Sequence, residues 1–235
     1  MRRNRRRILF IRHGEPDYEN DTLTETGFKQ AKLVAERLKD EGIEEIWSST
    51  HGRAVDTAKY TSELLGLPIK TADFIREITW GSTDGEKLFA GGHPWDIADE
   101  MARRGMDLND PDWRSNQFFA NNIVVNCVDQ VEKGIDEWLS DLGYTRNGLY
   151  YEHVIEEDHH RTIAFFCHGG SSSAAIAHIM NLPFPYVCAL LHMEFTGITI
   201  LRMDRKKGIC TLPCMELAND GRHIKEGSYH RLLNK

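Results

Sequence analysis

The sequence predicts an α/β protein, a three-layer α/β/α sandwich around a mainly parallel central sheet. Short apolar runs typical of buried strands alternate along the chain with longer segments whose apolar residues recur at helical spacing. Two of these runs, 8–11 and 163–167, are almost purely apolar, as in the strands of a sheet that is covered on both faces. Such alternation builds parallel sheets, and ligands bind beyond the carboxyl ends of their strands.

The first half of the chain alternates clearly. Thr24 can cap a helix in which apolar residues recur at helical spacing, and Gly42 can end it. A later helix is closed by Gly66 and Pro68. The predicted order is strand, helix, strand, helix and an extended segment, at 8–11, 24–42, 43–49, 51–68 and from 69 onward.

The pattern loosens from about Trp80 to Asn121, where Gly, Pro, Trp and Asp accumulate. We interpret residues 86–120 as an insertion with a short helix that covers the site, within a single domain that spans 1–235. Regular elements then resume as a long amphipathic helix, a connector with a hairpin at Asn147-Gly148, a buried strand, a helix and a strand near the sheet edge. These elements are expected at 123–142, 143–160, 163–167, 171–183 and 195–203.

Composition excludes several classes of function. The 235 residues are 40% hydrophobic and 28% charged, which is ordinary for a globular protein, and the net charge of −7 provides no basic surface for nucleic acid or an anionic membrane. No apolar run approaches the length of a membrane span. The one basic cluster is residues 1–7, which we interpret as a solvated tail. The oligomeric state stays open, a homodimer included.

The five cysteines are odd in number and lie mostly in apolar surroundings, which favours reduced thiols in a cytoplasmic protein. Cys210 and Cys214 are four residues apart, but no further Cys or His pair stands at the spacing of a zinc site, so neither a metal nor another cofactor is predicted. His159 and His160 follow three acidic residues, and a solvated turn is the preferred interpretation there over a metal site.

Three predicted strands end in residues suited to bind an anion. The first ends in Arg12-His13-Gly14 and a late one in His168-Gly169-Gly170, while a third ends in serines and leads to Arg53 at the start of a helix. Because the carboxyl ends of parallel strands share one edge of the sheet, we expect two imidazoles, two guanidiniums and helix N-terminal amides to meet there. Such a cluster favours a dianionic ligand, and a phosphoryl group fits best.

Two histidines beside a phosphoryl group can divide the chemistry. One can attack phosphorus through a ring nitrogen and form a phosphohistidine, while the other helps the arginines to neutralise the charge of the transition state. The leaving oxygen then needs a proton from a carboxylic acid. Glu77, just after the extended segment that begins at residue 69, is placed to supply it if its pKa is raised.

Five ordered motifs make the chain resemble the histidine phosphatase superfamily, in the branch that holds cofactor-dependent phosphoglycerate mutases and related phosphatases. The motifs are RHGE, LTETGFKQA, SSTHGRAVDTA, REITWGSTDG and CHGG, at 12–15, 23–31, 48–58, 76–85 and 167–170. A weaker match, LANDGRHI at 217–224, is similar to the late strand of that family. RHG alone is weak evidence, but five motifs in order are strong.

The resemblance implies a role for each predicted site residue. His13 would be the phosphorylated nucleophile, His168 would stabilise the transition state, and Glu77 would be the general acid. Arg12 and Arg53 would bind the phosphoryl group, joined by Gly14 and Gly169, which directly follow the two histidines. The family needs no metal, so the resemblance implies a metal-independent histidine acid-type phosphatase.

Several positions depart from the pattern of the family. Pro16 stands where a hydroxyl or amide side chain is usual, and Asn20 is one residue out of register with an Asn that contacts phosphate in longer relatives. Thr50-His51-Gly52 replaces a Pro-Leu type segment, and His51 could contact substrate. Asp84 stands where relatives often carry Glu. Trp80, Trp95 and Trp113 could line a substrate pocket, although tryptophan is more often part of a core.

The sequence therefore predicts a phosphomonoester hydrolase that acts through a phosphohistidine intermediate on a small phosphorylated metabolite. Phosphoryl transfer of the phosphoglycerate mutase type is the first alternative, although REITWG differs from the Glu-Arg-His-Tyr-Gly that is usual in mutases. A non-catalytic module that binds a phosphorylated ligand is the second alternative. Such a module would be expected to have lost the nucleophile or an arginine, and this chain retains both.

Overall fold

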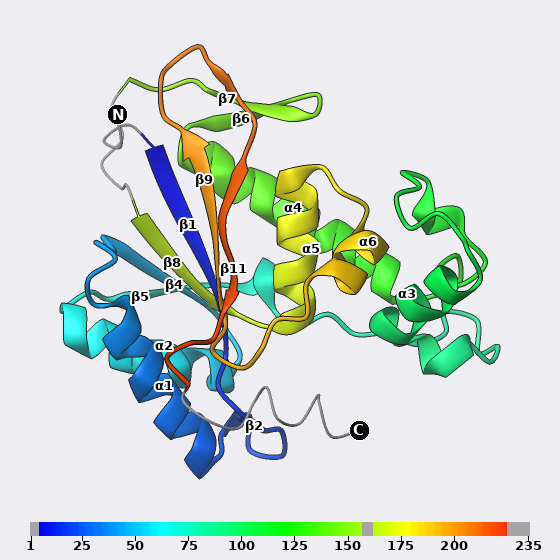
Figure 1. The fold of residues 1–235 in the computed structure, drawn as a ribbon, viewed down its shortest axis with the longest axis horizontal. Helices are drawn as coiled ribbons and strands as arrows, with labels where there is room; N and C mark the ends of the chain where they lie inside the picture. Colours follow the sequence, from blue (N-terminus) through cyan, green and yellow to red (C-terminus); the bar gives the residue numbers. More distant parts are fainter. Residues whose placement is uncertain (1–4, 157–161, 225–235) are drawn as a thin grey trace.

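A mixed six-stranded sheet forms the centre of the computed structural model, which describes residues 5–156 and 162–224 (Figure 1). In spatial order, its strands are β11 (Cys214–Asp220), β9 (Ile198–Asp204), β1 (Arg5–Arg12), β8 (Thr162–Cys167), β4 (Glu45–Ser49) and β5 (Ile69–Ala72). β9 runs antiparallel to both of its neighbours, and the other strands share one direction. The prediction of a mainly parallel sheet is confirmed.

Helices cover both faces of the sheet, because side chains along its strands alternate between two cores. Leu9 and Ile11 of β1 face a core with the first two helices, α1 (Glu25–Leu38) and α2 (Gly52–Leu65). Ile8 and Phe10 face the other core, with α4 (Val124–Asp141) and α5 (Gly169–Met180). Figure 1 shows these two pairs of helices on opposite sides of the sheet. The three layers match the prediction.

Local sequence explains where the first helices begin and end. The Thr24 side chain accepts a hydrogen bond from the amide of Gly27 at the start of α1, as the capping prediction requires. Gly66 ends α2 in the left-handed conformation, with φ of 67°, which favours glycine over other residues. All six residues of β8 are buried, in agreement with its apolar sequence.

The basic segment at the amino end differs from the prediction. β1 begins at Arg5 rather than Ile8, so Arg5–Arg7 belong to the sheet and the interpretation of 1–7 as a tail is wrong for these three residues. Arg6 is 1% exposed and lies over the ring of Tyr144, and Arg7 forms ion pairs with Glu41 and Glu216. These partners come from distant parts of the chain, which local sequence does not show. Residues 1–4 lie outside the described residues.

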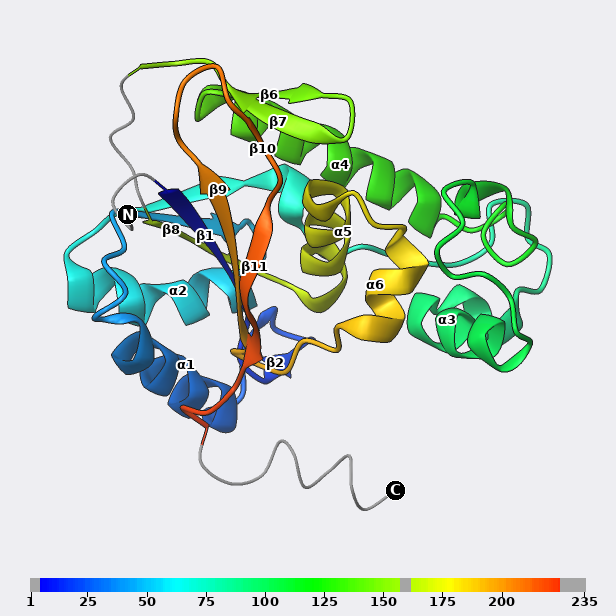
Figure 2. The ribbon, with the colours of Figure 1, turned by 45° about the horizontal axis from the view of Figure 1, so that its top comes forward.

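The segment predicted as an insertion is mostly irregular. It holds α3 (Pro94–Arg103) and short 3₁₀ turns at Phe89–Gly92 and Trp113–Ser115. α3 packs beside α6 (Phe184–Leu190), as Figure 2 shows. The Asn122 side chain accepts from the Gly81 amide and donates to the carbonyl oxygen of Gly92, and it thereby links the segment to the chain on either side of it. The segment follows Glu77 in the chain, and its role in covering the site stays a prediction.

Smaller sheets complete the fold. β6 (Tyr144–Asn147) and β7 (Tyr150–His153) form a hairpin, as predicted, but its turn is Gly148-Leu149, one residue later than expected. β10 (Cys210–Thr211) pairs with β7, and β2 (Pro16–Asp17) pairs with β3 (Thr22–Leu23). Within the described residues no single helix is long and apolar enough to cross a membrane, although α5 and α6 together would pass as one bent pair.

Candidate active site

His13 and His168 lie side by side because of the register between two strands. β1 pairs with β8 so that Arg12 is opposite Cys167, and the amide of His13 donates to the Cys167 carbonyl oxygen at 2.9 Å. The next residue of each strand is therefore a histidine at the carboxyl end of the sheet. The two ring centroids are 5.1 Å apart, and the residues are 1% and 0% exposed. The predicted pairing of imidazoles is present.

The His13 ring is held in the form that a nucleophile needs. Its Nδ1 lies 2.6 Å from the carbonyl oxygen of Gly14, and because a carbonyl only accepts, Nδ1 carries the hydrogen. Burial, together with the nearby Arg12 guanidinium, lowers the pKa of His13 to about 3. The ring is therefore neutral at physiological pH, with the lone pair on Nε2.

His168 is held by a serine that no sequence motif assigned to the site. Its Nε2 lies 2.8 Å from Oγ of Ser49, and that oxygen also accepts from the amide of His51 at 3.3 Å. The serine hydrogen is then free to point at Nε2. Burial, followed by the charge of a protonated His13, lowers the pKa of His168 well below its usual value, so the ring is neutral. When Ser49 donates to Nε2, the hydrogen of the neutral ring lies on Nδ1.

The Nδ1 of His168 is buried and has no hydrogen-bond partner among the described residues. Buried polar groups without partners are rare in folded proteins and commonly mark functional sites. An N–H group in this position can donate to an oxygen of a bound phosphoryl group. His13 and His168 thus present complementary ring atoms, one with a lone pair and one with a hydrogen.

Arg12 is fixed by a loop that precedes β9. Its Nη1 donates to the Met193 carbonyl oxygen at 2.6 Å, and its guanidinium carbon lies 4.3 Å from the centre of the Phe195 ring. Its Nε is buried without a partner in the described part of the chain. Stacking on an aromatic face leaves the edge of a guanidinium open to an anion. The Phe195 ring also lies 5.8 Å from that of His13, so it packs against both predicted site residues.

Arg53 lies in the first turn of α2, where its Nη1 donates to Oδ1 of Asp21 at 2.6 Å. The Tyr18 ring lies 5.5 Å from its guanidinium carbon. The buried Nε of Arg53, like that of Arg12, has no partner within the described residues. His51, which the sequence left open as a substrate contact, has its ring 5.1 Å from that of His168. Arg53 and His51 thus approach the histidine pair from the start of α2.

Glu77 lies at the same edge of the sheet, beside the start of α5, whereas Arg53 and His51 lie at the start of α2. Its Oε1 accepts from the backbone amides of Ile78, Gly170 and Ser171 at 3.0, 3.0 and 3.1 Å, so the carboxyl group lies on the first turn of α5. Burial raises its pKa, although the Ser171 amide and the charge of Arg12 act in the opposite direction. With Oε1 occupied by three donors, the proton of the neutral acid belongs on Oε2. A raised pKa is the condition under which the sequence analysis expected Glu77 to act as a general acid.

The two glycines after the histidines have different surroundings. The Gly14 amide donates to Oγ1 of Thr57 at 3.0 Å, and its carbonyl accepts from His13, so both of its peptide groups are used inside the protein. A Cβ at Gly14 would lie 2.7 Å from the Gly27 carbonyl oxygen. The structure therefore gives Gly14 a packing role, and its contact with substrate stays a prediction. Gly169 opens α5 beside Arg12, and its contact with substrate stays a prediction.

Asn219 fixes the loop that holds Arg12. Its Oδ1 accepts from the Glu194 amide at 2.8 Å, and its Nδ2 donates to the His192 carbonyl oxygen at 2.6 Å. A Cβ at Gly197 would lie 2.3 Å from Oδ1 of Asn219, which shows how tightly this loop wraps the amide. Asn219 belongs to the LANDGRHI segment, so that match was the available sequence signal. Ser49 lies in the SSTHGRAVDTA match, which gave it no role of its own, and Phe195 carried no such signal.

The tryptophans of the insertion divide between core and surface. Trp113 is buried against Phe119 and Phe184, as expected of a core residue. Trp80 is 39% exposed and forms an aromatic cluster with Trp95 and His93, in which the ring centroids of Trp80 and His93 are 4.9 Å apart. Trp80 is three residues from Glu77, so a contact with the leaving group stays a prediction.

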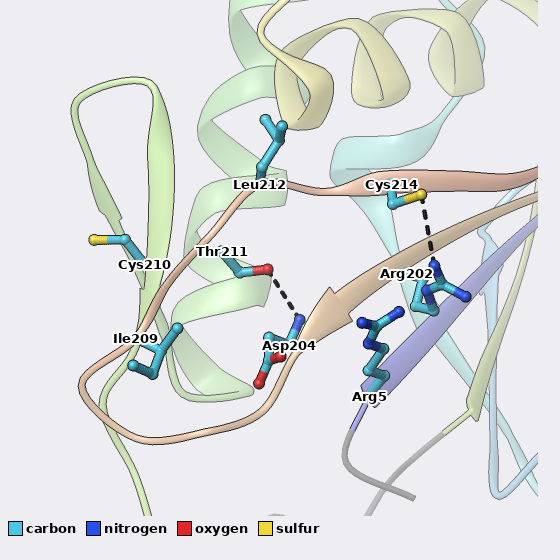
Figure 3. A pocket seen from close by; sticks show the side chains of 8 residues that line it. All are labelled: Arg5, Arg202, Asp204, Ile209, Cys210, Thr211, Leu212 and Cys214. Atoms are coloured by element: carbon cyan, nitrogen blue, oxygen red, sulfur yellow. Dashed lines mark hydrogen bonds between the residues drawn. The ribbon is translucent and has the colours of Figure 1, made fainter. Parts of the chain in front are cut away.

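A separate cavity of about 270 Å³ lies at the opposite end of β1 and β9 (Figure 3). Arg5, Arg202 and the exposed Cys214 line it, and none of the predicted site residues does. It is therefore distinct from the histidine site. Among the described residues no group of three His, Cys, Asp or Glu could hold a metal ion. His159 and His160 lie outside the described residues.

Comparison with known families decides where this chain belongs. A model of the histidine phosphatase superfamily (branch 1) matches residues 8–214. The chain belongs to this superfamily. The match includes His13, Arg53, Glu77 and His168, so the resemblance noted in the sequence is confirmed.

Individual relatives in the histidine phosphatase superfamily carry different names. The chain is 24% identical over 211 residues to "Putative phosphoserine phosphatase 2" of Hydrogenobacter thermophilus, covering 86% of this chain and 92% of that protein. It is 36% identical over 90 residues to "Probable phosphoglycerate mutase GpmB" of Yersinia pestis, which is 34% of this chain and 42% of that one. These names do not separate a phosphatase from a mutase for this chain.

Solved structures share the fold at low sequence identity. A mycobacterial glucosyl-3-phosphoglycerate phosphatase complexed with VO3 has a TM-score of 0.61 at 23% identity and covers 92% of this chain and 100% of that one. A phosphoserine phosphatase of Entamoeba histolytica in complex with 3-phosphoglyceric acid has a TM-score of 0.58 at 19% identity, covering 92% and 98%. This likeness confirms the fold class and leaves the substrate of this member of the histidine phosphatase superfamily open.

Proposed function

We propose that this chain hydrolyses phosphomonoesters of small metabolites through a phosphohistidine at His13. The observation that carries the proposal is the pair of ring contacts, from which we infer the two tautomers. Gly14 leaves Nε2 of His13 with a lone pair, while Ser49 leaves Nδ1 of His168 with a hydrogen and no partner within the described residues. One ring can attack phosphorus while the other donates to a phosphoryl oxygen, which suits in-line displacement.

In the first step, Nε2 of His13 forms a bond to phosphorus as the ester P–O bond breaks. The guanidiniums of Arg12 and Arg53 and the N–H of His168 neutralise the oxygens, where negative charge is spread in the transition state. Oε2 of Glu77 gives its proton to the leaving oxygen, so that an alcohol departs. Glu77 is then ionised, a form that its three backbone donors stabilise.

In the second step, water attacks the phosphohistidine and the N–P bond breaks. Glu77 now accepts the proton of the attacking water, which restores the acid for the next cycle. Inorganic phosphate leaves, and His13 regains its lone pair. Glu77 thus acts first as an acid and then as a base. Over the cycle, the ester and one water are converted to an alcohol and inorganic phosphate, and the enzyme returns to its starting form.

Small phosphorylated metabolites are the substrate class that we favour. The relatives named above carry names that refer to phosphoserine and glucosyl-3-phosphoglycerate. Trp80, partly exposed and three residues after Glu77, is a candidate surface for the organic part of such a substrate. Mutase-type transfer is the second candidate, because the local similarity to the named phosphoglycerate mutase is higher at 36%.

A substrate panel tests this function. Wild type should release phosphate from p-nitrophenyl phosphate and from at least one of phosphoserine, 3-phosphoglycerate and sugar phosphates, with EDTA present throughout. His13→Ala should lose at least about 10⁴-fold in kcat, as removal of a nucleophile does. Interconversion of 3-phosphoglycerate and 2-phosphoglycerate with little free phosphate would instead favour the mutase. Activity on no phosphomonoester would favour a binding module.

A further inference from the structure

Asp21 occupies a group of anion-binding donors next to the predicted site. One oxygen accepts from Nη1 of Arg53 at 2.6 Å, and the other accepts from the Gly52 amide at 2.8 Å. The second oxygen also lies 3.4 Å from Nδ1 of His51. A guanidinium, a helix N-terminal amide and an imidazole are the kinds of groups that hold phosphate in proteins. In this structure they hold a carboxylate of the same chain.

The backbone around Asp21 brings it directly onto the start of α2. His51 occupies the N-cap position of this helix but makes no side-chain cap hydrogen bond, and Asp21 caps the helix from outside in its place. A Cβ at Gly52 would lie 2.1 Å from the Asp21 carbonyl oxygen, so glycine is required for this approach. Asp21 itself has a φ of 47°, in the left-handed region where few residues other than glycine, Asn and Asp are found.

The Asp21 carboxylate is charged, and its charge reaches the catalytic centre. Burial alone would raise the pKa of Asp21, but the Gly52 amide and the Arg53 guanidinium outweigh it and hold the pKa below its usual value. Burial and Arg12 set the low pKa of His13, and Asp21 acts on it in the opposite direction. A dianionic phosphoryl group at Arg53 would therefore meet a negative charge already paired with the same guanidinium.

We propose that Asp21 is a built-in counter-ion of Arg53 that competes with phosphoryl oxygens for this guanidinium. It weakens the binding of the phosphoryl group in the substrate and of the inorganic phosphate that leaves, which limits inhibition by product. The inference rests on the proposed function in one respect, which is that Arg53 binds the phosphoryl group. A counter-ion of this kind also keeps Arg53 in place on α2 while the site is empty.

Binding of inorganic phosphate at pH 7, measured by calorimetry, tests the competition directly. Asp21→Asn removes the charge but keeps an oxygen that accepts from Gly52, and Asn tolerates the left-handed backbone. The Kd for phosphate should fall about tenfold, as expected when one nearby like charge is removed. Glu19→Gln is the matched control, because Glu19 is an exposed acid of the same loop, and its Kd should stay within about twofold of wild type.

The outcomes separate this inference from the proposed function. An unchanged or higher phosphate Kd in Asp21→Asn would contradict the proposed competition, since it would mean that Asp21 only holds Arg53 in position. Asp21→Gly, which also removes the helix cap but accepts the left-handed backbone, should shift the Kd in the same direction and provides a second variant if the first folds poorly. If Asp21→Asn tightens phosphate binding while wild type hydrolyses no phosphomonoester, the counter-ion role of Asp21 is supported and the hydrolase proposal fails.

Discussion

Oγ of Ser49 lies 2.8 Å from Nε2 of His168, and the two residues come from adjacent parallel strands, β4 and the end of β8. Ser49 also accepts from the His51 amide, so one serine links the start of α2 to the His168 imidazole. The ring orientation of His168 is therefore fixed by a side chain of the neighbouring strand.

Replacement of Ser49 by alanine should lower kcat about tenfold, the factor equivalent to one lost hydrogen bond of ordinary strength. Without the serine, the hydrogen of His168 can move to Nε2, and the donor to the phosphoryl oxygen is lost. Steady-state kinetics with p-nitrophenyl phosphate measures the effect. Ser48→Ala is the matched control, because the Ser48 hydroxyl donates only to the Ser49 carbonyl oxygen. Equal losses in the two variants would count against the tautomer argument.

Asn219→Ala should raise KM about tenfold with a smaller change in kcat, because two hydrogen bonds that hold the loop under Arg12 are removed. Asn219 has a φ of 45°, so alanine also adds backbone strain. Asn219→Gly separates the two effects, since glycine accepts that backbone but lacks the amide. We expect KM to rise in both variants. Normal kinetics in Asn219→Gly would show that only the backbone conformation matters.

The pH dependence of kcat/KM should have an acidic limb near pH 3 and a basic limb above the usual range of a glutamate. Burial and Arg12 lower the pKa of His13 to about 3, so the nucleophile is neutral above that pH. Burial raises the pKa of Glu77, so the acid stays protonated at higher pH than an exposed glutamate would. In Glu77→Gln the basic limb should disappear along with most of the activity. Persistence of that limb would assign it to another group.

Glu77 should also make stability depend on pH. Because its pKa is raised on folding, the folded state binds more protons than the unfolded state between the two pKa values, and stability falls as pH rises through this window. Glu77→Gln removes the ionisation. The variant should therefore gain in Tm relative to wild type at pH 8 by more than at pH 4. Calorimetric melts at the two values measure the difference, and a gain that is the same at both would contradict the raised pKa.

Features that depend on a continuous segment could be predicted from the sequence. The strand that ends in Arg12 and His13 is an apolar run followed at once by polar residues, and Thr24 precedes an amphipathic helix, so both were predicted close to their observed positions. His168 follows the same pattern. Since both strands were expected in one parallel sheet, their convergence at one edge could be predicted as well.

Features that depend on contacts between distant segments could not be predicted. Arg6 looked like part of a solvated tail because its partner Tyr144 is far along the chain. Asp21 lies in a turn, and Phe195 lies just before β9 although the sequence predicted a strand from residue 195. Only tertiary structure brings these two side chains to Arg53 and Arg12. The contact between the Gly14 amide and the hydroxyl of Thr57 on α2 likewise joins distant segments, and no pattern in the sequence indicated it.

Detection of the covalent intermediate tests the central claim most directly. Wild type mixed with p-nitrophenyl phosphate and quenched within milliseconds should carry one phosphoryl group on His13, identified by mass spectrometry under alkaline conditions that preserve phosphohistidine. The adduct should be absent from His13→Ala and should accumulate in Glu77→Gln if water attack becomes slow. Hydrolysis by wild type with no phosphorylated residue at any time, or with the phosphoryl group on His168, would contradict the account.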